Sequence, residues 1–204
     1  MPDDETILSA ENQEPETPDE EKGSFKMDLY FWTQALAVAL VFLVLTFTFV
    51  GRVIRVVGSS MVPTLHANDL MLLQSVGYEP KQGDVVVLRK PGFPPPPQGE
   101  APVVKRVIAT AGQHVVVSYA DQCVYVDGEK LDEPYINEVM RDPLSSELTV
   151  LDVVVPEGSI YVMGDNRNHS SDSRSENLGT VDTRYVLGRA ICVLLPFSDF
   201  GLIE

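Results

Sequence analysis

The stretch Val103-Val104-Lys105-Arg106-Val107-Ile108-Ala109 decides how this chain folds. Its β-branched residues favour an extended strand, and alternation along a strand puts Lys105 and Arg106 on opposite faces. If one face packs on a core, one of these two cations must point inward. An unpaired ammonium group is costly to bury, so a lysine here is unusual. The stretch therefore predicts a half-buried strand and an inward-pointing cation.

Short valine-rich segments of the same kind recur from residue 52 to residue 204, bounded by Gly, Pro or Asn-Asp. The strands we expect are 53–57, 70–74, 84–88, 103–109, 114–119, 122–126, 150–155, 159–163 and 186–195. Asp127-Gly128, which follows one of them, is a strong hairpin signal. The spacing indicates a mainly β, mostly antiparallel domain over residues 52–204 rather than βαβ units. The polar stretch 137–148 is interpreted as a surface insertion between strands.

An uncharged hydrophobic run, Phe31–Val50, precedes this domain. About twenty residues suffice to cross a hydrocarbon core of ~30 Å as a helix. Trp32 stands at one end and Arg52 at the other, as at membrane interfaces. A cleaved signal peptide would begin nearer the N-terminus behind a basic stretch, and a buried core helix would be shorter or carry a polar stripe. We predict a single transmembrane helix over residues 29–51.

The first 28 residues are strongly acidic, with ten Asp or Glu residues and two Lys. So few apolar residues cannot offset the chain entropy, and we predict an acidic tail over residues 1–28 that is disordered through residue 24. The net charge of -15 argues against nucleic acid as a partner. Lys and Arg are nearly balanced on the two sides of the hydrophobic run, so charge leaves the sidedness of the membrane open.

Cysteine and histidine give no sign of a metal centre. Cys123 and Cys192 are too few for a disulfide framework, and we expect buried free thiols, with a bridge between them as the alternative. His66, His114 and His169 are scattered and form no cluster with Cys or Glu. We therefore predict no metal and no organic cofactor.

Two segments far apart in the chain carry the reactive groups. Ser60 lies in a turn just past a strand, where Pro63 forces a tight exit and the backbone N–H of Ser60 is available to an oxyanion. A serine hydroxyl needs a nearby base, and Ser59 is the competing nucleophile. Lys105 is the candidate base, because arginine does not deprotonate. Bringing the pKa of a lysine from ~10.4 to near 7 takes roughly 4 to 5 kcal/mol, which burial against apolar groups can supply.

A third segment, Gly164–Arg174, places hydroxyl, carboxylate and guanidinium groups in one loop. An Asp–Arg pair there can fix geometry, and a serine hydroxyl can orient a lysine amine. The alternative is an ordinary turn rich in Asn, Asp and Ser.

The residue motifs in these segments, and their order along the chain, resemble those of the bacterial type I signal peptidases, the serine–lysine leader peptidases. Residues 60–65 resemble the nucleophile motif of that family, 83–87 its next motif, 105–108 the motif with the base, and 164–174 the last. The compact length is similar to Gram-positive members. The resemblance implies a β-rich serine–lysine peptidase domain behind a single membrane anchor.

The resemblance also implies roles for individual residues. Ser60 would attack the scissile carbonyl, and neutral Lys105 would take its proton. Ser170 would hydrogen-bond the lysine, while Asp172 and Arg174 would form a supporting ion pair.

Positions around the nucleophile complete the candidate site. Gly58 stands where some members carry a serine that assists the oxyanion hole, which leaves the second donor open. Ser59 is grouped with the supporting residues, and Met61 and Pro63 are the candidate substrate contacts.

The predicted function is removal of N-terminal signal peptides from exported precursor proteins by a membrane-bound serine endopeptidase. The resemblance implies a cytoplasmic-membrane location with the catalytic domain on the extracytoplasmic side. It also implies small residues, typically alanine, at the first and third positions before the cut. The predicted partners are signal-peptide-bearing precursors and the lipid bilayer. Two alternatives remain: a self-cleaving serine–lysine regulator, and a catalytically inactive, membrane-tethered β-domain that acts as a binding module.

Overall fold

The computed structural model describes residues 19–49, 51–94, 101–141 and 150–203. The chain forms two compact units, which divide between Val44 and Leu45. Most of the predicted acidic tail, residues 1–18, lies outside the described residues.

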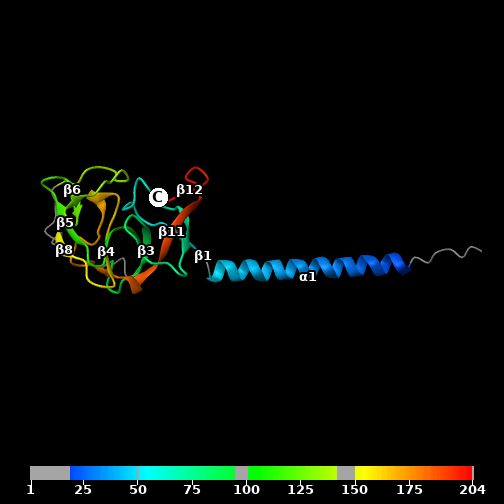
Figure 1. Ribbon diagram of the computed structural model, residues 1–204. Coiled ribbons are helices and arrows are strands. Elements are labelled where there is room, and N and C mark those ends of the chain that lie inside the picture. The colour runs from blue at the N-terminus through cyan, green and yellow to red at the C-terminus, as the bar shows by residue number, and fades with distance from the viewer. Residues whose placement is uncertain (1–18, 50, 95–100, 142–149, 204) are drawn as a thin grey trace, which may run out of the picture. The chain divides into compact units, whose positions relative to one another are not determined.

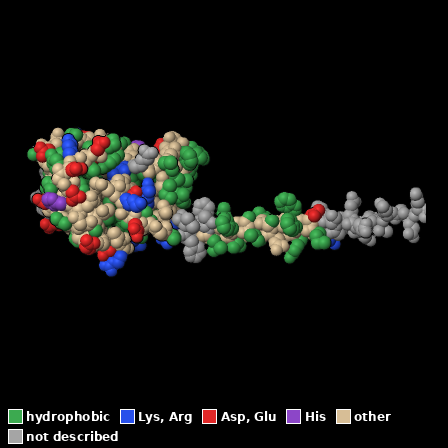
Figure 2. Space-filling model, viewed as in Figure 1, with side chains coloured by type: hydrophobic (Ala, Val, Ile, Leu, Met, Phe, Trp, Pro, Cys, Tyr) green, Lys and Arg blue, Asp and Glu red, His purple; other side chains and the backbone are tan. Residues whose placement is uncertain are grey.

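The first unit is built on one helix, α1 (Asp19–Phe49) (Figure 1). Within it, Lys26–Leu45 is long and apolar enough to cross a membrane, with a mean hydropathy of 1.8 and no buried part. Hydrophobic side chains line much of the visible face of this segment in the space-filling view, whereas charged side chains are spread over the visible face of the β unit (Figure 2). The helix extends further toward the N-terminus than the predicted span, which began at residue 29. Glu and Lys favour helix, and acidic residues suit a helix N-terminus, which explains the extension.

The second unit is a β domain whose described part contains twelve strands. They are β1 (Gly51–Arg55), β2 (Leu70–Gln74), β3 (Val85–Leu88), β4 (Val103–Thr110), β5 (His114–Ser118), β6 (Cys123–Val126), β7 (Glu129–Lys130), β8 (Asp152–Val154), β9 (Ser159–Met163), β10 (Val181–Asp182), β11 (Val186–Leu195) and β12 (Gly201–Leu202). Two short 3-10 helices, η1 (Arg167–His169) and η2 (Thr183–Tyr185), complete it.

The strands form two antiparallel sheets. The larger has the order β1-β2-β11-β3-β4-β9-β10, with β12 paired to β11, and the smaller has the order β7-β6-β5-β8. The prediction of a mainly β, antiparallel fold behind one apolar helix is confirmed, and only the two-residue strands β7, β10 and β12 were not anticipated.

The larger sheet is covered on both faces around β3 and β4. Val85 belongs to one core cluster, with Leu65 and Leu73, and its neighbour Val86 belongs to another, with Ile160. Adjacent strand residues point to opposite faces, so both faces carry a core. This is why β4 is buried along most of its length, rather than on the single face that we expected from its sequence.

Candidate active site

Ser60 and Lys105 meet although 45 residues separate them in the chain. The Nζ atom of Lys105 donates a hydrogen bond to the Oγ atom of Ser60 at 2.7 Å. Strand β4 holds the lysine between β3 and β9, and its side chain is buried, with 3% of the residue exposed. The serine, on the turn after β1, is half-buried and reachable from solvent. The pair therefore combines an accessible hydroxyl with an amine shielded from water.

The surroundings of Lys105 favour its neutral form. Desolvation by burial is the main cause, and it lowers the pKa of Lys105 to about 8. The carboxylate of Asp172 opposes this shift, the guanidinium of Arg174 adds to it, and the carboxylate of Asp165 again opposes it. The unprotonated amine that a general base requires is therefore a minor form at pH 7 and makes up about half of the lysine near pH 8.

The turn that carries Ser60, called the nucleophile turn after the predicted role of this residue, is anchored by the residues that follow it. Met61 and Leu65 are buried in the core, with 2% and 0% exposure, and the N–H of Leu65 donates to the carbonyl of Met61 at 2.9 Å. Met61 thus offers almost no surface to a substrate, which contradicts its predicted role, whereas Pro63 is exposed. Gly58 has a φ of +88°, a left-handed conformation that favours glycine.

The loop 164–174 contains the expected ion pair. Asp172 and Arg174 are both buried, and the Nε atom of Arg174 donates to Oδ1 of Asp172 at 2.8 Å. Burial alone would raise the pKa of Asp172, but the Arg174 guanidinium outweighs it and lowers that pKa. The N–H of Gly164 also donates to the Asp172 carboxylate, at 3.0 Å. The pair therefore fixes the two ends of the loop against each other.

This loop touches the nucleophile turn through backbone atoms. The N–H of Asn166 donates to the carbonyl of Ser60 at 3.0 Å, and its side-chain amide donates to the carbonyl of Ser59 at 3.1 Å. At Gly164, a Cβ atom would lie 2.4 Å from the carbonyl oxygen of Ser60 and 2.3 Å from Oγ of Ser170. Such contacts are sterically forbidden, so only glycine allows the turn and the loop to approach this closely.

The hydrogen bond implied between Ser170 and the lysine is absent from the structure. The Oγ atom of Ser170 is buried and has no hydrogen-bond partner among the described residues. It lies against Gly164 instead. The side chain of Lys105 is therefore held by its hydrogen bond to Ser60 and by its burial in β4.

One ion pair at the site escaped the sequence analysis. Arg106 follows Lys105 in β4 and is also buried, at 1% exposure. Its Nε and Nη2 atoms donate to the two carboxylate oxygens of Asp165 at 2.9 and 2.8 Å. The Oγ1 atom of Thr64 donates to the same carboxylate at 2.5 Å. A buried arginine needs an acidic partner, and that rule could have pointed from Arg106 to a carboxylate of the loop 164–174.

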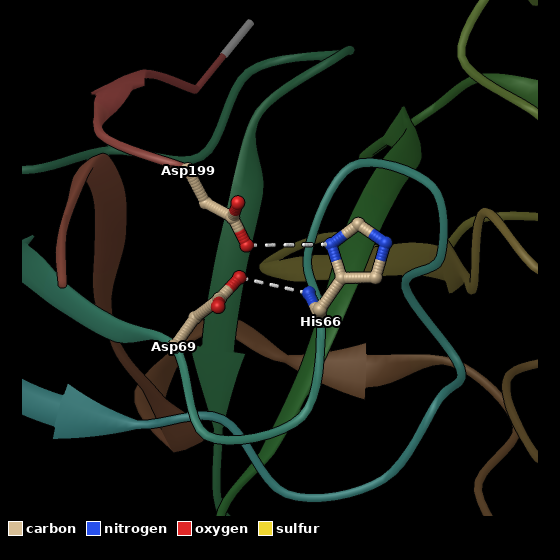
Figure 3. Close-up of side chains that lie close together, drawn as sticks. All are labelled: His66, Asp69 and Asp199. Atoms are coloured by element: carbon tan, nitrogen blue, oxygen red, sulfur yellow. Dashed lines mark hydrogen bonds and ion pairs between the residues drawn. The ribbon is translucent and has the colours of Figure 1, made fainter. Parts of the chain in front are cut away.

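A second cluster of ionisable groups lies beside the nucleophile turn (Figure 3). His66, Asp69 and Asp199 place one potential ligand atom each within 4.8 Å of one another. This cluster could not be predicted from the sequence, because Asp199 lies 130 residues after Asp69 in the chain. The backbone N–H of His66 donates to Oδ2 of Asp69 at 2.8 Å, and Nδ1 of His66 lies 3.9 Å from Oδ2 of Asp199. The buried Asp69 carboxylate is thus already engaged in the turn after Leu65.

The two cysteines are free, as expected, but only Cys123 is fully buried, while Cys192 is half-buried.

A serine hydroxyl in contact with a buried lysine of lowered pKa is the arrangement that serine–lysine hydrolases use. The chain belongs to the peptidase S26 family of signal peptidases, whose family model matches residues 29–195.

Named relatives agree over most of the chain. A signal peptidase I of Bacillus licheniformis is 34% identical over 188 residues, which cover 88% of this chain and 96% of that protein. A signal peptidase IB of Staphylococcus aureus is 32% identical over 86% of this chain and 94% of its own length. A crystal structure of a signal peptidase I from Enterococcus faecalis is 29% identical and covers 55% of this chain and 97% of that one, with a TM-score of 0.40.

Proposed function

We propose that this protein is a membrane-bound serine endopeptidase that removes N-terminal signal peptides from precursor proteins. The observation that carries the proposal is the 2.7 Å contact between Nζ of Lys105 and Oγ of Ser60. The lowered pKa of Lys105, about 8, supports the role of the amine as general base. Membership in a family of signal peptidases supports the substrate class.

In the first half of the reaction, Oγ of Ser60 attacks the scissile carbonyl carbon while neutral Lys105 takes the hydroxyl proton. The negative charge moves to the carbonyl oxygen, and the backbone N–H of Ser60 is the proposed donor to it. When the intermediate collapses, the C–N bond breaks and protonated Lys105 gives its proton to the leaving amine. The mature protein departs, and the signal peptide stays esterified to Ser60.

In the second half, water attacks the ester while Lys105 takes a proton from it. The ester C–O bond breaks, and the proton returns to Oγ of Ser60. The Asp172–Arg174 pair is proposed to hold the loop that faces the lysine, and exposed Pro63 is proposed as a substrate contact.

The apolar helix α1 supports a membrane anchor. The proposed location is the cytoplasmic membrane, with the catalytic domain on the extracytoplasmic side. A signal peptide also has a hydrophobic segment, so anchoring enzyme and substrate in one bilayer raises their effective concentration without additional contacts. An inactive β module remains the rival function. It is disfavoured because Ser60 and Lys105 are both present and in contact.

The experiment is cleavage of a purified precursor that carries an Ala-x-Ala site, with the full-length protein in detergent. Wild type and Lys105→Ala are compared, and the new N-terminus is identified by mass spectrometry. We expect cleavage directly after the second alanine by wild type and none by the variant. No cleavage by either protein would favour the inactive module.

The choice of nucleophile is tested in the same assay. We expect Ser60→Ala to abolish cleavage and Ser59→Ala, one position away in the same turn, to retain it. The reverse result would make Ser59 the nucleophile.

A further inference from the structure

Residues 132–141, here called the strap, leave β7 and run along the loop 164–174. Half of this segment was expected to belong to a surface insertion. Its side chains nevertheless reach into the site. Glu133 forms an ion pair with Nη2 of Arg167, and the two side chains are 6% and 0% exposed. A buried ion pair between a connecting segment and a catalytic loop requires an explanation, since desolvating both charges is costly.

The ion pair leads directly to the nucleophile turn. Arg167, held by Glu133 at one end of its guanidinium, donates from Nε to the carbonyl of Gly164 at 3.0 Å. Gly164 is the residue whose Cβ would collide with the Ser60 carbonyl. Nη1 of Arg167 is buried without a hydrogen-bond partner among the described residues, so Glu133 is the group that balances this charge. Glu133, Arg167, Gly164 and Ser60 thus form a continuous chain of contacts.

The strap contacts the same loop at further points. The ring of Tyr135 lies over the guanidinium of Arg106, with Cζ 4.0 Å from the ring centroid. The N–H of Asn137 donates to the carbonyl of Asp165 at 3.3 Å. Cation–π contact covers Arg106 on the side that Asp165 leaves open.

Asn168 fastens the far end of the strap. Its Nδ2 atom donates to Oε1 of Glu138 at 2.8 Å and to the carbonyl of Val139 at 3.0 Å. Its Oδ1 atom accepts from the N–H of Arg141 at 2.9 Å. An aspartate at position 168 could not donate either of the first two bonds, and would face Glu138 with like charge.

We propose that the strap positions the catalytic loop, and that Glu133 is its principal positioning residue, acting through Arg167 and Gly164 on the turn that carries Ser60. The inference rests on the proposed peptidase function. Glu133 touches no reacting atom in this scheme. Its contribution is to hold the loop close enough to keep water away from Lys105 and to keep Ser60 within reach of it.

The test compares Glu133→Gln with Asp132→Asn in the full-length protein in detergent, on the precursor that carries an Ala-x-Ala site. Both variants convert a carboxylate to an amide, but Asp132 is exposed. For Glu133→Gln we expect kcat to fall about 10- to 100-fold with KM within about twofold of wild type, because a small misplacement of reacting groups is enough for such a loss. Asp132→Asn should match wild type, and Glu133→Asp, which keeps the charge, should recover part of the loss.

The pH profile of kcat distinguishes the proposed positioning role of Glu133 from a purely structural one. The groups that face Lys105 are Asp172, Arg174 and Asp165 from the loop and Ser60 from the turn. If the loop opens in Glu133→Gln, water reaches the lysine and the acidic limb of the profile should move to higher pH. A kcat and an acidic limb equal to those of Asp132→Asn would overturn the proposal. So would a loss of kcat with an unmoved limb.

Hydrogen exchange at the N–H of Asn166, which is bonded to the Ser60 carbonyl, tests the positioning without any cleavage. We expect faster exchange in Glu133→Gln than in Asp132→Asn, and equal rates would refute the proposed chain of contacts. If wild type fails to cleave, the proposed function fails, while this measurement still decides the role of the strap. If Glu133→Gln does not fold, Asn168→Asp, which only loosens the strap, takes its place with the same expected directions.

Discussion

Lys105 and Arg106 are consecutive residues of β4, and both are almost completely buried, but their surroundings differ. Arg106 donates two hydrogen bonds to Asp165, one to the carbonyl of Gly83 at 2.8 Å, and lies under the ring of Tyr135. Lys105 makes one hydrogen bond, to the hydroxyl of Ser60, and forms no salt bridge with any described residue.

The comparison shows that two neighbouring buried cations on one strand can serve different roles, one structural and one chemical. A cation with a well-placed carboxylate keeps its charge and ties two segments together. A cation without one loses its proton easily, because burial penalises only the charged form. The Arg106 surroundings therefore hold the site together, and the Lys105 surroundings suit the base that we propose.

The largest expected effect is a loss of activity in a Lys105 variant that should leave stability intact. Lys105→Met keeps the length and burial of the side chain but removes the base, so we expect kcat/KM to fall by at least about 10³-fold. Stability at pH 7 should be unchanged or higher, because no ammonium has to be desolvated. Precursor cleavage and urea unfolding measure the two quantities. A large loss of stability would show that the lysine also holds the fold.

The converse change is Arg106→Met, which leaves the buried Asp165 carboxylate without its partner. Breaking a buried pair from one side typically costs about 3–5 kcal/mol, and we expect a loss of that size in urea unfolding. Arg184→Met is the matched control, because Arg184 pairs with Asp182 at the surface and is 82% exposed. There we expect a loss of at most about 1 kcal/mol. Equal losses in the free energy of unfolding would show that the buried Arg106 pair stabilises the fold no more than the exposed Arg184 pair.

The pH dependence sharpens the contrast without a mutation. Below the Lys105 pKa of about 8, kcat/KM should fall about tenfold per pH unit and should level off above it. Between about 8 and 10.5, the unfolded chain binds a proton at Lys105 that the folded chain does not. The free energy of unfolding should therefore rise with pH across this window. The rise should be missing in Lys105→Met, and a flat activity profile from pH 6 to 9 would argue against a lysine base.

The smallest effect is expected at Gly58. Space around its Cβ position is open, so Gly58→Ser would meet no clash, but its φ of +88° penalises any side chain. We expect a stability loss of about 1 kcal/mol, and a change of less than about threefold in kcat/KM from two opposing effects, strain and an added donor. Gly58→Ala, which has the strain without the hydroxyl, isolates the donor. A larger kcat/KM for Ser than for Ala would assign that difference to the hydroxyl.

The sequence predicted the strands well where valine patterning is local. The bounds of β2, β9 and β11 agree with the expected ones, because each is a run of apolar residues between turn signals. The two-residue strands are too short to carry a periodic pattern. Each forms by pairing with a longer neighbouring strand. α1 began earlier than expected, since charge alone suggested disorder where helix propensity prevailed.

The candidate site was predictable only in part. Motif order pointed to Ser60 and Lys105, which the fold brings into contact. The pairs Arg106–Asp165 and Glu133–Arg167 span 59 and 34 residues. No local sequence pattern predicts which arginine pairs with which carboxylate over such separations. The implied hydrogen bond between Ser170 and Lys105 is missing for a similar reason. The direction of the buried Ser170 hydroxyl depends on how closely Gly164 approaches it, and the motif does not show that approach.

Strand β11 is a late part of the chain that lies in the middle of the larger sheet. It pairs with both β2 and β3, so the middle of the larger sheet is completed by residues 186–195, after Ser60, Lys105 and the loop 164–174 have left the ribosome. Until then the facing edges of β2 and β3 are unpaired, and contacts between such distant segments form slowly. A growing chain thus carries every reactive group before it has the complete sheet, and we expect proteolytic activity only after β11 has paired with both neighbours.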